Sequence, residues 1–449
     1  MMFQKIHNFF QYDTKNHEWS QIWAVFVVSM SGFNTITLIA WPSPSIPILT
    51  SNLSDIAVIT DEEASYFSVI PGLATFFLAP VIALLSDYIG RKYLIILLTV
   101  PQIISWSIVH TARNLTDLYI SRAISGISDA IIFCVIPIYV GEICTPKVRG
   151  QWGILFMILL FLGQFLINVV GSYCAIKTTA LVFITFPIIQ CIFALFIPES
   201  PYYLIVKSRN AEAERSLKWL RWNRLVEEEL DQLIKDVKRQ ISERGTFKDV
   251  FVISTNRRAL LICLAMRGFQ MWSGLMAFAT YTQQMFALQN TSQSSKISAM
   301  IYTGILFITA LSYLLVMQKL GRRKLMLFST IGTTTALFIE TVYLYLEFEI
   351  NFELTSVNWI PLTTMIFYIV FMVGGLGILP SLMVGELFSS SVKGKAIGIV
   401  NVFYCLCALI IPKVFQYLTA NFSSEQTASN SPGSLLLLFV NDELVKGQK

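Results

Sequence analysis

Long apolar runs are the feature that most limits what this chain can fold into. Eleven segments of about twenty residues carry almost no charge, at 22–41, 66–86, 93–112, 117–140, 151–172, 179–198, 258–278, 299–318, 325–346, 359–384 and 395–418. A helix of about 20 apolar residues spans the hydrocarbon of a bilayer. Only 14% of the residues are charged, against about 25% in soluble domains. The sequence therefore predicts an all-α polytopic membrane protein.

Helices are expected because an unpaired backbone amide in lipid costs several kcal/mol, and a helix pairs its own amides. The runs are also continuous, whereas membrane strands are short and alternate in polarity. The chain has three His residues, two of them in the first twenty positions. These offer no catalytic triad and no metal cluster. We expect no enzyme activity, cofactor or metal.

The basic residues are concentrated in every second loop, on one side of the membrane. With the N-terminus inside, the cytoplasmic tail and loops hold 25 of the 33 Lys and Arg residues. Basic loops stay in the cytoplasm. All four Asn-x-Ser/Thr sequons fall on the opposite side, where glycosylation is expected, at Asn52, Asn114, Asn290 and Asn421. The positive charge therefore reflects topology and not a nucleic-acid partner.

The spacing of the runs divides the chain into five parts. A cytoplasmic tail covers 1–21, a bundle of six helices 22–198, and a second bundle of five helices 258–418. Between the bundles, the loop 199–257 has short amphipathic patterns, and 199–258 holds 23 charged residues. After residue 418 the chain is polar, and its one apolar stretch of six residues is too short to span a bilayer. The tail 419–449 is predicted to remain outside.

A motif recurs at matching places in the two halves. Asp-Tyr-Ile-Gly-Arg-Lys at 87–92 follows the second run, and Leu-Gly-Arg-Arg-Lys at 320–324 follows the eighth. A Glu and a base also lie seven residues apart after the fourth run and again after the tenth. Such repeats are typical of transporters whose site lies between two pseudo-symmetric halves.

The repeated residues have the chemistry of a gate. Glycine permits a tight turn between two helices, and arginine can bind a neighbouring carboxylate through two hydrogen bonds. The bases could instead only enforce topology, but two copies with matching glutamates favour a clamp at the cytoplasmic helix ends. The predicted gating residues are Asp87, Arg91, Glu142, Arg149, Arg322, Arg323, Glu386 and Lys393.

With these motifs the chain resembles the sugar porter branch of the major facilitator superfamily, and most of all the facilitated trehalose transporters of insects. Further similar signatures are Trp-Pro-Ser-Pro at 41–44, Arg122 at the start of the fourth run, Pro137-x-Tyr139 before Glu142, and Pro-Glu-Ser-Pro at 198–201. The resemblance covers about residues 20–420. It implies twelve helices in two bundles, a rocking motion without nucleotide, and a sugar such as a hexose or trehalose as the substrate.

The resemblance also implies where the sugar binds, and there the chain departs from the family. Gln-Met-Trp-Ser-Gly-Leu-Met at 270–276 stands where members usually have Gln-Gln-x-Ser-Gly-x-Asn, and Asn168 stands where a Gln is common. The candidate binding residues are Asn34, Asn168, Gln270 and Tyr281. The resemblance also implies a twelfth helix, for which we find no apolar run; a truncated or alternatively spliced product, or a faulty gene model, would explain this.

Ionisable residues inside the predicted helices are rare and usually functional. Arg122 and Asp129 are seven residues apart, two turns along one helix face. We expect Asp129 to pair structurally with Arg122 or Arg267. Proton-coupled sugar porters place an Asp on the first helix opposite the arginine, and here that position is Asn34, which cannot titrate. This favours facilitated diffusion, with a proton site at Asp129 as the alternative.

The function predicted from the sequence is facilitative sugar transport by alternating access, in a monomer at the plasma membrane. A carrier of another small organic solute is the nearest alternative, because the sugar site has lost several polar residues. A sensor that does not transport is a third possibility, suggested by the missing helix. The intact gating residues argue against it.

Overall fold

The described part of the chain is built from helices. The computed structural model describes residues 18–51, 56, 58–222, 226–242, 246–288, 294–316, 321–348, 359–388 and 392–425, and no strand occurs among them. Eleven helical segments in these residues are long and apolar enough to cross a bilayer. The eleven predicted runs and the all-α fold class are therefore confirmed.

The helices of the first half follow one another with short connections. They are α2 (Trp19–Ala40), α3 (Pro42–Leu49), α4 (Asp61–Ile89), α5 (Arg91–Leu97), α6 (Thr99–Thr111), α7 (Leu115–Ile143), α8 (Pro146–Trp152), α9 (Leu155–Tyr173) and α10 (Ile176–Phe196).

Four short helices and then the second half complete the described chain. The short helices are α11 (Pro201–Val206), α12 (Asn210–Arg221), α13 (Glu227–Ser242) and α14 (Phe247–Val252). The second half contains α15 (Ser254–Trp272), α16 (Leu275–Leu288), α17 (Ser295–Val316), α18 (Arg322–Phe348), α19 (Ile360–Met372), the π-helix η2 (Val373–Gly377), α20 (Leu379–Leu387) and α21 (Lys393–Glu425).

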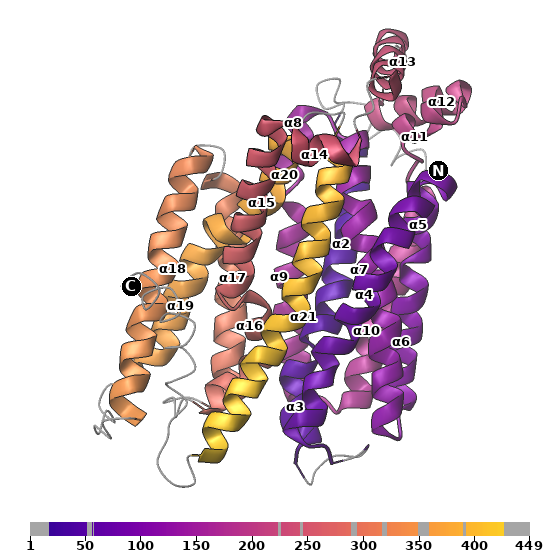
Figure 1. Ribbon diagram of the computed structural model, residues 1–449. Coiled ribbons are helices and arrows are strands. Elements are labelled where there is room, and N and C mark those ends of the chain that lie inside the picture. Colours follow the sequence, from indigo (N-terminus) through magenta and orange to yellow (C-terminus); the bar gives the residue numbers. More distant parts are fainter. Residues whose placement is uncertain are drawn as a thin grey trace.

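The long helices lie side by side in two groups (Figure 1). In the first group α4 packs on α7 and α2 packs on α9, and in the second α18 packs on α19 and α15 packs on α21. The groups meet where α4 contacts α21, α9 contacts α17, and α3 contacts α16. A solute that crosses the protein between the groups would therefore pass among these helices.

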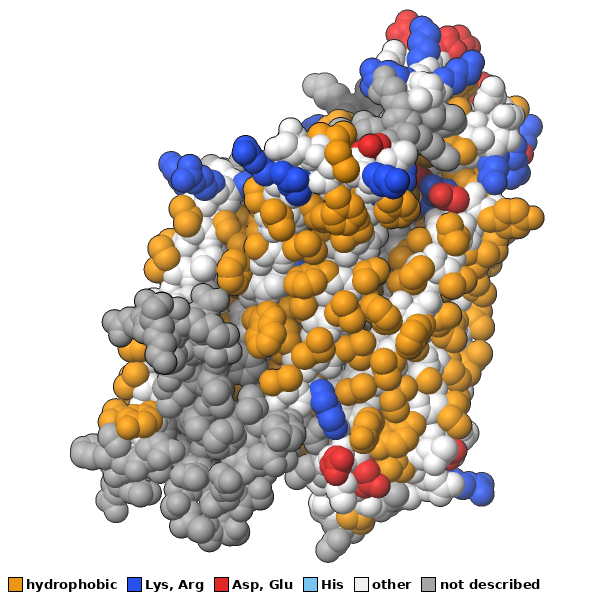
Figure 2. Space-filling model, in the orientation of Figure 1, with side chains coloured by type: hydrophobic (Ala, Val, Ile, Leu, Met, Phe, Trp, Pro, Cys, Tyr) orange, Lys and Arg blue, Asp and Glu red, His pale blue; other side chains and the backbone are white. Residues whose placement is uncertain are grey.

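The surface has the polarity of a membrane protein. Figure 2 shows hydrophobic side chains over the middle of the visible face, and Lys and Arg gathered near the end that carries α11–α13. Many large apolar side chains face outward, including Phe77, Leu84, Phe196 and Ile331, each at least 67% exposed. A soluble protein would bury such residues, whereas lipid solvates them.

Two helices of the second half are interrupted near their middle. Gly274 has φ +92°, a conformation that side chains with a Cβ rarely adopt, and it separates α15 from α16. The π-helix η2 separates α19 from α20, and its Leu376 amide donates to the Ser329 hydroxyl at 2.9 Å. Short π-segments often mark functional positions in helices.

Helices α11, α12 and α13 form a small unit at one end of the molecule (Figure 1). Their buried apolar residues pack on one another and include Tyr203, Leu204, Ala213 and Val237. The polar faces carry exposed ion pairs such as Arg209–Glu212 at 2.6 Å. The amphipathic helices that the sequence predicts in 199–257 are thus present, and their place in the cytoplasm stays a prediction.

Protease access tests that prediction. In sealed right-side-out vesicles, the loop 199–258 should resist added protease, because α11–α13 would face the interior. Permeabilising the same vesicles with detergent should allow cleavage, which controls for a loop that is merely folded. Cleavage in sealed vesicles would reverse the orientation and place Asn114 in the cytoplasm.

Candidate functional site

Arg91 lies at the centre of an ionic cluster at the end of the first bundle nearest α11–α13. Its guanidinium is 3.2 Å from the carboxylates of both Glu142 and Asp87, and it donates to the Ser86 carbonyl at 3.1 Å. It also lies over the Tyr203 ring, 5.1 Å from the centroid. We call Asp87, Arg91, Glu142, Glu199 and Tyr203 the inner cluster; it joins α4, α5, α7 and α11.

Glu199 fixes the start of α5 within this cluster. Its carboxylate accepts hydrogen bonds from the backbone amides of Arg91, Lys92 and Ser200, at 2.8–3.2 Å. A carboxylate is favoured at a helix start, where amides lack partners. Gly90 has φ +108°, and a Cβ there would lie 2.4 Å from Glu199 Oε2. Burial raises the pKa of Glu199, and the amide hydrogen bonds oppose this rise.

The structure brings together only some of the predicted gating residues. Asp87, Arg91 and Glu142 are in direct contact, as given above. Arg149, Arg322 and Arg323 are exposed. The side chains of Glu386 and Lys393 lie outside the described residues. The clamp of the second half therefore stays a prediction, while the first half has a defined geometry.

At the opposite end of the molecule, polar contacts join the two halves. Gln283 Nε2 donates to Ser172 Oγ at 2.7 Å, and its backbone amide donates to Ser43 Oγ at 3.4 Å. Lys413 Nζ donates to Ser65 Oγ at 2.8 Å and lies over the Tyr66 ring at 4.4 Å. We call Ser43, Ser65, Ser172, Gln283 and Lys413 the outer seam. No gating residue predicted from the sequence belongs to it.

The predicted binding residues of the first half are buried and hydrogen-bonded within that half. Asn34 Nδ2 donates to Gln190 Oε1 at 2.6 Å. Asn168 accepts from Ser43 Oγ at 2.8 Å and donates to the Gln164 carbonyl at 2.9 Å. Asn168 is 0% exposed. Its contact with Ser43 places it directly beside the outer seam.

The predicted binding residues of the second half are also buried. Gln270 donates to the Gly377 carbonyl of the π-helix at 2.6 Å and accepts from Arg267 at 2.8 Å. Tyr281 lies at a kink inside α16, where its backbone leaves the helical region. Gln270 therefore connects the two interrupted segments of this half, and it is not in contact with Asn168.

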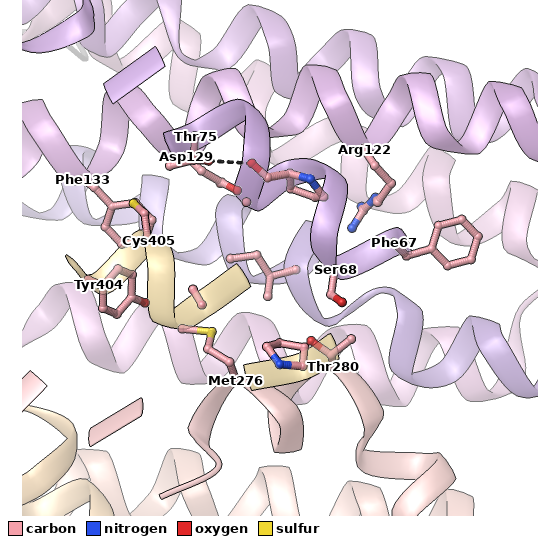
Figure 3. A pocket seen from close by; sticks show the side chains of 15 residues that line it. Phe67, Ser68, Thr75, Arg122, Asp129, Phe133, Met276, Thr280, Tyr404 and Cys405 are labelled. Carbon is pink, nitrogen blue, oxygen red and sulfur yellow. Dashed lines mark hydrogen bonds between the residues drawn. The ribbon is translucent and has the colours of Figure 1, made fainter. Parts of the chain in front are cut away.

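A cavity of about 70 Å³ lies between the halves. It is lined by Ile39 of α2, by Phe67, Ser68, Pro71, Gly72 and Thr75 of α4, by Arg122, Asp129 and Phe133 of α7, by Met276 and Thr280 of α16, and by Tyr404, Cys405, Ala408 and Pro412 of α21. Figure 3 shows side chains from both halves facing this space. None of the four predicted binding residues lines it.

The two charged residues of the cavity do not form an ion pair. Arg122 Nη1 donates to the Leu38 carbonyl at 2.5 Å, and the guanidinium lies 5.1 Å from the Trp41 ring centroid. Asp129 lies two turns further along α7, near the Thr35 hydroxyl. No ion pair within 4.0 Å joins Asp129 to any base among the described residues.

The described residues therefore show no direct ion pair of the predicted kind for Asp129, although the charge of Arg122 acts on it from a greater distance. Two helical turns separate Asp129 from Arg122 by roughly 10 Å along the axis, and Arg122 is directed toward α2. Arg267 is directed toward Gln270 and the Tyr404 ring, whose centroid is 5.0 Å away. Arg122 and Asp129 share one face of α7 and therefore line the same cavity, but residues two turns apart on one helix are too far apart for direct contact.

Some of the other residues at this interface carry a signal that is visible in the sequence. Lys413 is a charge inside the last apolar run, which is the signal that identified Arg122 and Asp129. Thr280 and Gln283 are two polar residues in the interrupted helix α16. Tyr404 and Cys405 lie within the last apolar run and also line the cavity.

These features define a class of protein: a polytopic membrane carrier whose described residues form two helical halves, an ionic cluster, a polar seam and a cavity between the halves. The model of the family described as "Sugar (and other) transporter" matches residues 5–437, and the chain belongs to that family. It is similar to the facilitated trehalose transporter Tret1 of Bombyx mori, with 29% identity over 403 residues, 89% of this chain and 78% of the relative. The Polypedilum vanderplanki Tret1 is 28% identical and covers 90% of this chain and 80% of the relative.

Solved structures give the same fold. A major facilitator proton:xylose symporter, XylE, bound to 6-bromo-6-deoxy-D-glucose matches with a TM-score of 0.69, 17% identity, and coverage of 93% of this chain and 92% of that chain. The inward-open xylose transporter XylE from E. coli matches with a TM-score of 0.66, 17% identity, and coverage of 88% and 89%. The chain therefore has the major facilitator fold that its repeated motifs implied.

The inner cluster leads to a prediction about Glu142. Glu142→Gln removes the charged acceptor of Arg91, and a hydrogen bond to a charged group contributes about 1.5–3 kcal/mol. If the cluster holds the cytoplasmic end shut, the variant should shift toward the inward-open state. Labelling of the cavity residue Cys405 by an impermeant thiol reagent should then increase in inside-out vesicles.

Asp87→Asn is the matched control, because Asp87 is the same distance from Arg91 but its side chain is 74% exposed, against 12% for Glu142. Exposed pairs contribute little, so labelling should change less. If both variants are labelled as in the unsubstituted protein and take up solute normally, Glu142 and Asp87 have no role in gating and serve only topology and folding.

Proposed function

We propose that this protein carries a sugar, a hexose or trehalose, across the plasma membrane by facilitated diffusion. The observation that carries the proposal is a cavity between the two halves, lined by apolar residues together with Arg122, Asp129 and several hydroxyl side chains, in a chain of the sugar (and other) transporter family. The relatives from Bombyx mori and Polypedilum vanderplanki are described as facilitated trehalose transporters. A polar solute of this kind needs a path that shields its hydroxyls from lipid.

The contacts between the halves suit alternate opening of the two ends. The hydrogen bonds of the outer seam join neutral groups, including the Gln283 backbone amide, apart from the bond that Lys413 donates. Each neutral hydrogen bond contributes only about 0.5–1.5 kcal/mol net, because water replaces the partner. The seam can therefore separate at small cost when solute binding favours the other state. The inner cluster lies within the first half, so it can favour closure of the cytoplasmic end only by fixing the helix ends of that half.

The position of Asn34 supports uniport. Its amide is uncharged at every physiological pH and is hydrogen-bonded to Gln190. It occupies the place where proton-coupled porters have a titratable Asp, so this position cannot link a proton to the sugar. The membrane-buried carboxylate of Asp129 is the residue on which a coupled mechanism would depend.

Further features belong to the same proposal. Asn114 is exposed at the start of α7, as an acceptor of N-linked sugar must be. Asn52 and Asn290 lie outside the described residues, as does the side chain of Asn421. The two halves enclose their cavity within one chain, which agrees with a transporting monomer. A carrier of another small organic solute remains the second candidate, because two charged side chains line the cavity.

Net uptake tests the mode of transport. In proteoliposomes containing the full chain, labelled trehalose or glucose should enter until the inside and outside concentrations are equal. A protonophore should leave the final level unchanged, because Asn34 provides no proton site. Accumulation that collapses together with the pH difference would reject uniport and indicate coupling through Asp129. A panel of organic ions tested in parallel would identify the second candidate.

Substitution of Asn168 and Gln270 tests the carried-over binding residues. Each side chain is satisfied by neighbours in its own half, so contact with a solute requires an exchange of partners during rocking. Alanine at either position should weaken substrate affinity by about 1–3 kcal/mol, because a buried hydroxyl then loses its partner. Surface expression should stay constant. Unchanged affinity in both variants would place the solute elsewhere between the halves.

A further inference from the structure

Two opposite charges face one cavity in the membrane without meeting. Figure 3 shows the side chains of Arg122 and Asp129 entering the cavity from the same helix, α7. Arg122 is 1% exposed and Asp129 is 5% exposed. Arg122 Nε and Nη2 and Asp129 Oδ1 have no hydrogen-bond partner among the described protein atoms. These three atoms are buried in this structure, so two residues that line the cavity hold two donors and one acceptor without described protein partners.

Such groups are costly to leave without partners. An ionised group removed from water costs several kcal/mol unless a counter-ion or hydrogen bonds compensate. The Leu38 carbonyl and the Trp41 ring satisfy only part of the Arg122 guanidinium. The Thr35 hydroxyl is a hydrogen-bond partner of Asp129, but Asp129 Oδ1 has none among the described protein atoms. This arrangement is expected of residues that take partners from a ligand, and not of residues that stabilise the fold.

The other walls of the cavity have the character of a ligand site. Phe67, Phe133 and Met276 give apolar surface, while Ser68 and Thr280 add hydroxyl groups. Sites for small organic molecules typically combine such walls with a few polar groups. A cavity needs about 10–15 Å³ of this kind of volume for each water, so about 70 Å³ holds several waters or one small ligand.

The pair of charges selects the kind of ligand. An anion would bind Arg122 but would face the carboxylate of Asp129, and a cation would have the reverse conflict. A hydroxyl group both donates and accepts, so a neutral polyol can accept from the guanidinium with one oxygen and donate to the carboxylate with another. Hydrogen bonds to charged groups are about twice as strong as neutral ones.

We propose that this cavity is a sugar-binding site in which Arg122 donates to one hydroxyl of the sugar and Asp129 accepts from another. Thr280 of α16 and Tyr404 of α21 line the same cavity from the second half, so the ligand contacts both halves. The inference rests on the proposed function and names the site that serves it. It explains how a chain without several of the family's usual Gln and Asn residues can bind a sugar.

Cys405 offers a direct test, because this natural thiol lines the cavity and all seven cysteines are free. The full chain is reconstituted with Cys405 as its only cysteine and is labelled with methyl methanethiosulfonate, an uncharged reagent. Glucose should slow this labelling. A matched protein that keeps only Cys407, which is buried two residues along α21 but does not line the cavity, should label at the same rate with and without glucose.

Substitutions in α7 test whether the protection of Cys405 by glucose depends on Asp129. Asp129→Ala should raise the glucose concentration for half protection by about tenfold or more, the loss expected for a charged hydrogen bond. Asp129→Asn keeps an acceptor oxygen and should have a smaller effect. Ser128→Ala is the control for a disturbed helix, because Ser128 is buried beside Asp129 and bonds the Leu98 carbonyl instead. It should leave half protection unchanged.

Glucose uptake measured in the same vesicles separates the two proposals. Uptake without protection of Cys405, or with half protection unchanged in Asp129→Ala, would overturn the cavity site and leave sugar transport standing. Protection that depends on Asp129 in a protein without uptake would support the site and contradict transport. Protection by an amino-acid zwitterion but not by glucose would overturn the assignment of a neutral polyol.

Discussion

The hydrocarbon core of a membrane offers no water to a backbone amide, and most of this structure follows from that constraint. Each spanning segment must satisfy its amides internally, so the described chain crosses as helices. At the π-helix the protein supplies a partner for the interrupted backbone, because the Ser329 hydroxyl accepts from the Leu376 amide. The same constraint places strong ionic interactions at the helix ends, where Arg91 joins Glu142 and Asp87.

Charges that remain inside the membrane are therefore informative. Lys413 donates a hydrogen bond at the outer seam. Arg267 donates to Gln270 and lies over the Tyr404 ring. Only Arg122 and Asp129 face the cavity between the halves with atoms that no described protein group satisfies. The inner cluster, the seam and the cavity together describe a carrier whose ends open in turn around a polar centre.

The sequence predicts the helices well because each one is a run whose apolar character is local. It also indicates the contact of Arg91 with Glu142, because the repeated motif places both at neighbouring helix ends. Tertiary contacts between side chains cannot be predicted from such local patterns. The partners of Asn168 and Gln270 come from Ser43 and Gly377, which are far away in the sequence. The spacing of Arg122 and Asp129 predicts a shared face, but the direction of each side chain depends on α2 and on the second half.

The most direct test of alternate opening is uptake by a protein whose outer seam is locked. Ser43 Oγ lies 3.4 Å from the Gln283 backbone amide, so Ser43→Cys with Gln283→Cys, in a background without other cysteines, should form a disulfide between the halves. Oxidation should abolish sugar uptake, and reduction of the same vesicles should restore it. Full uptake by the completely cross-linked protein would contradict the account.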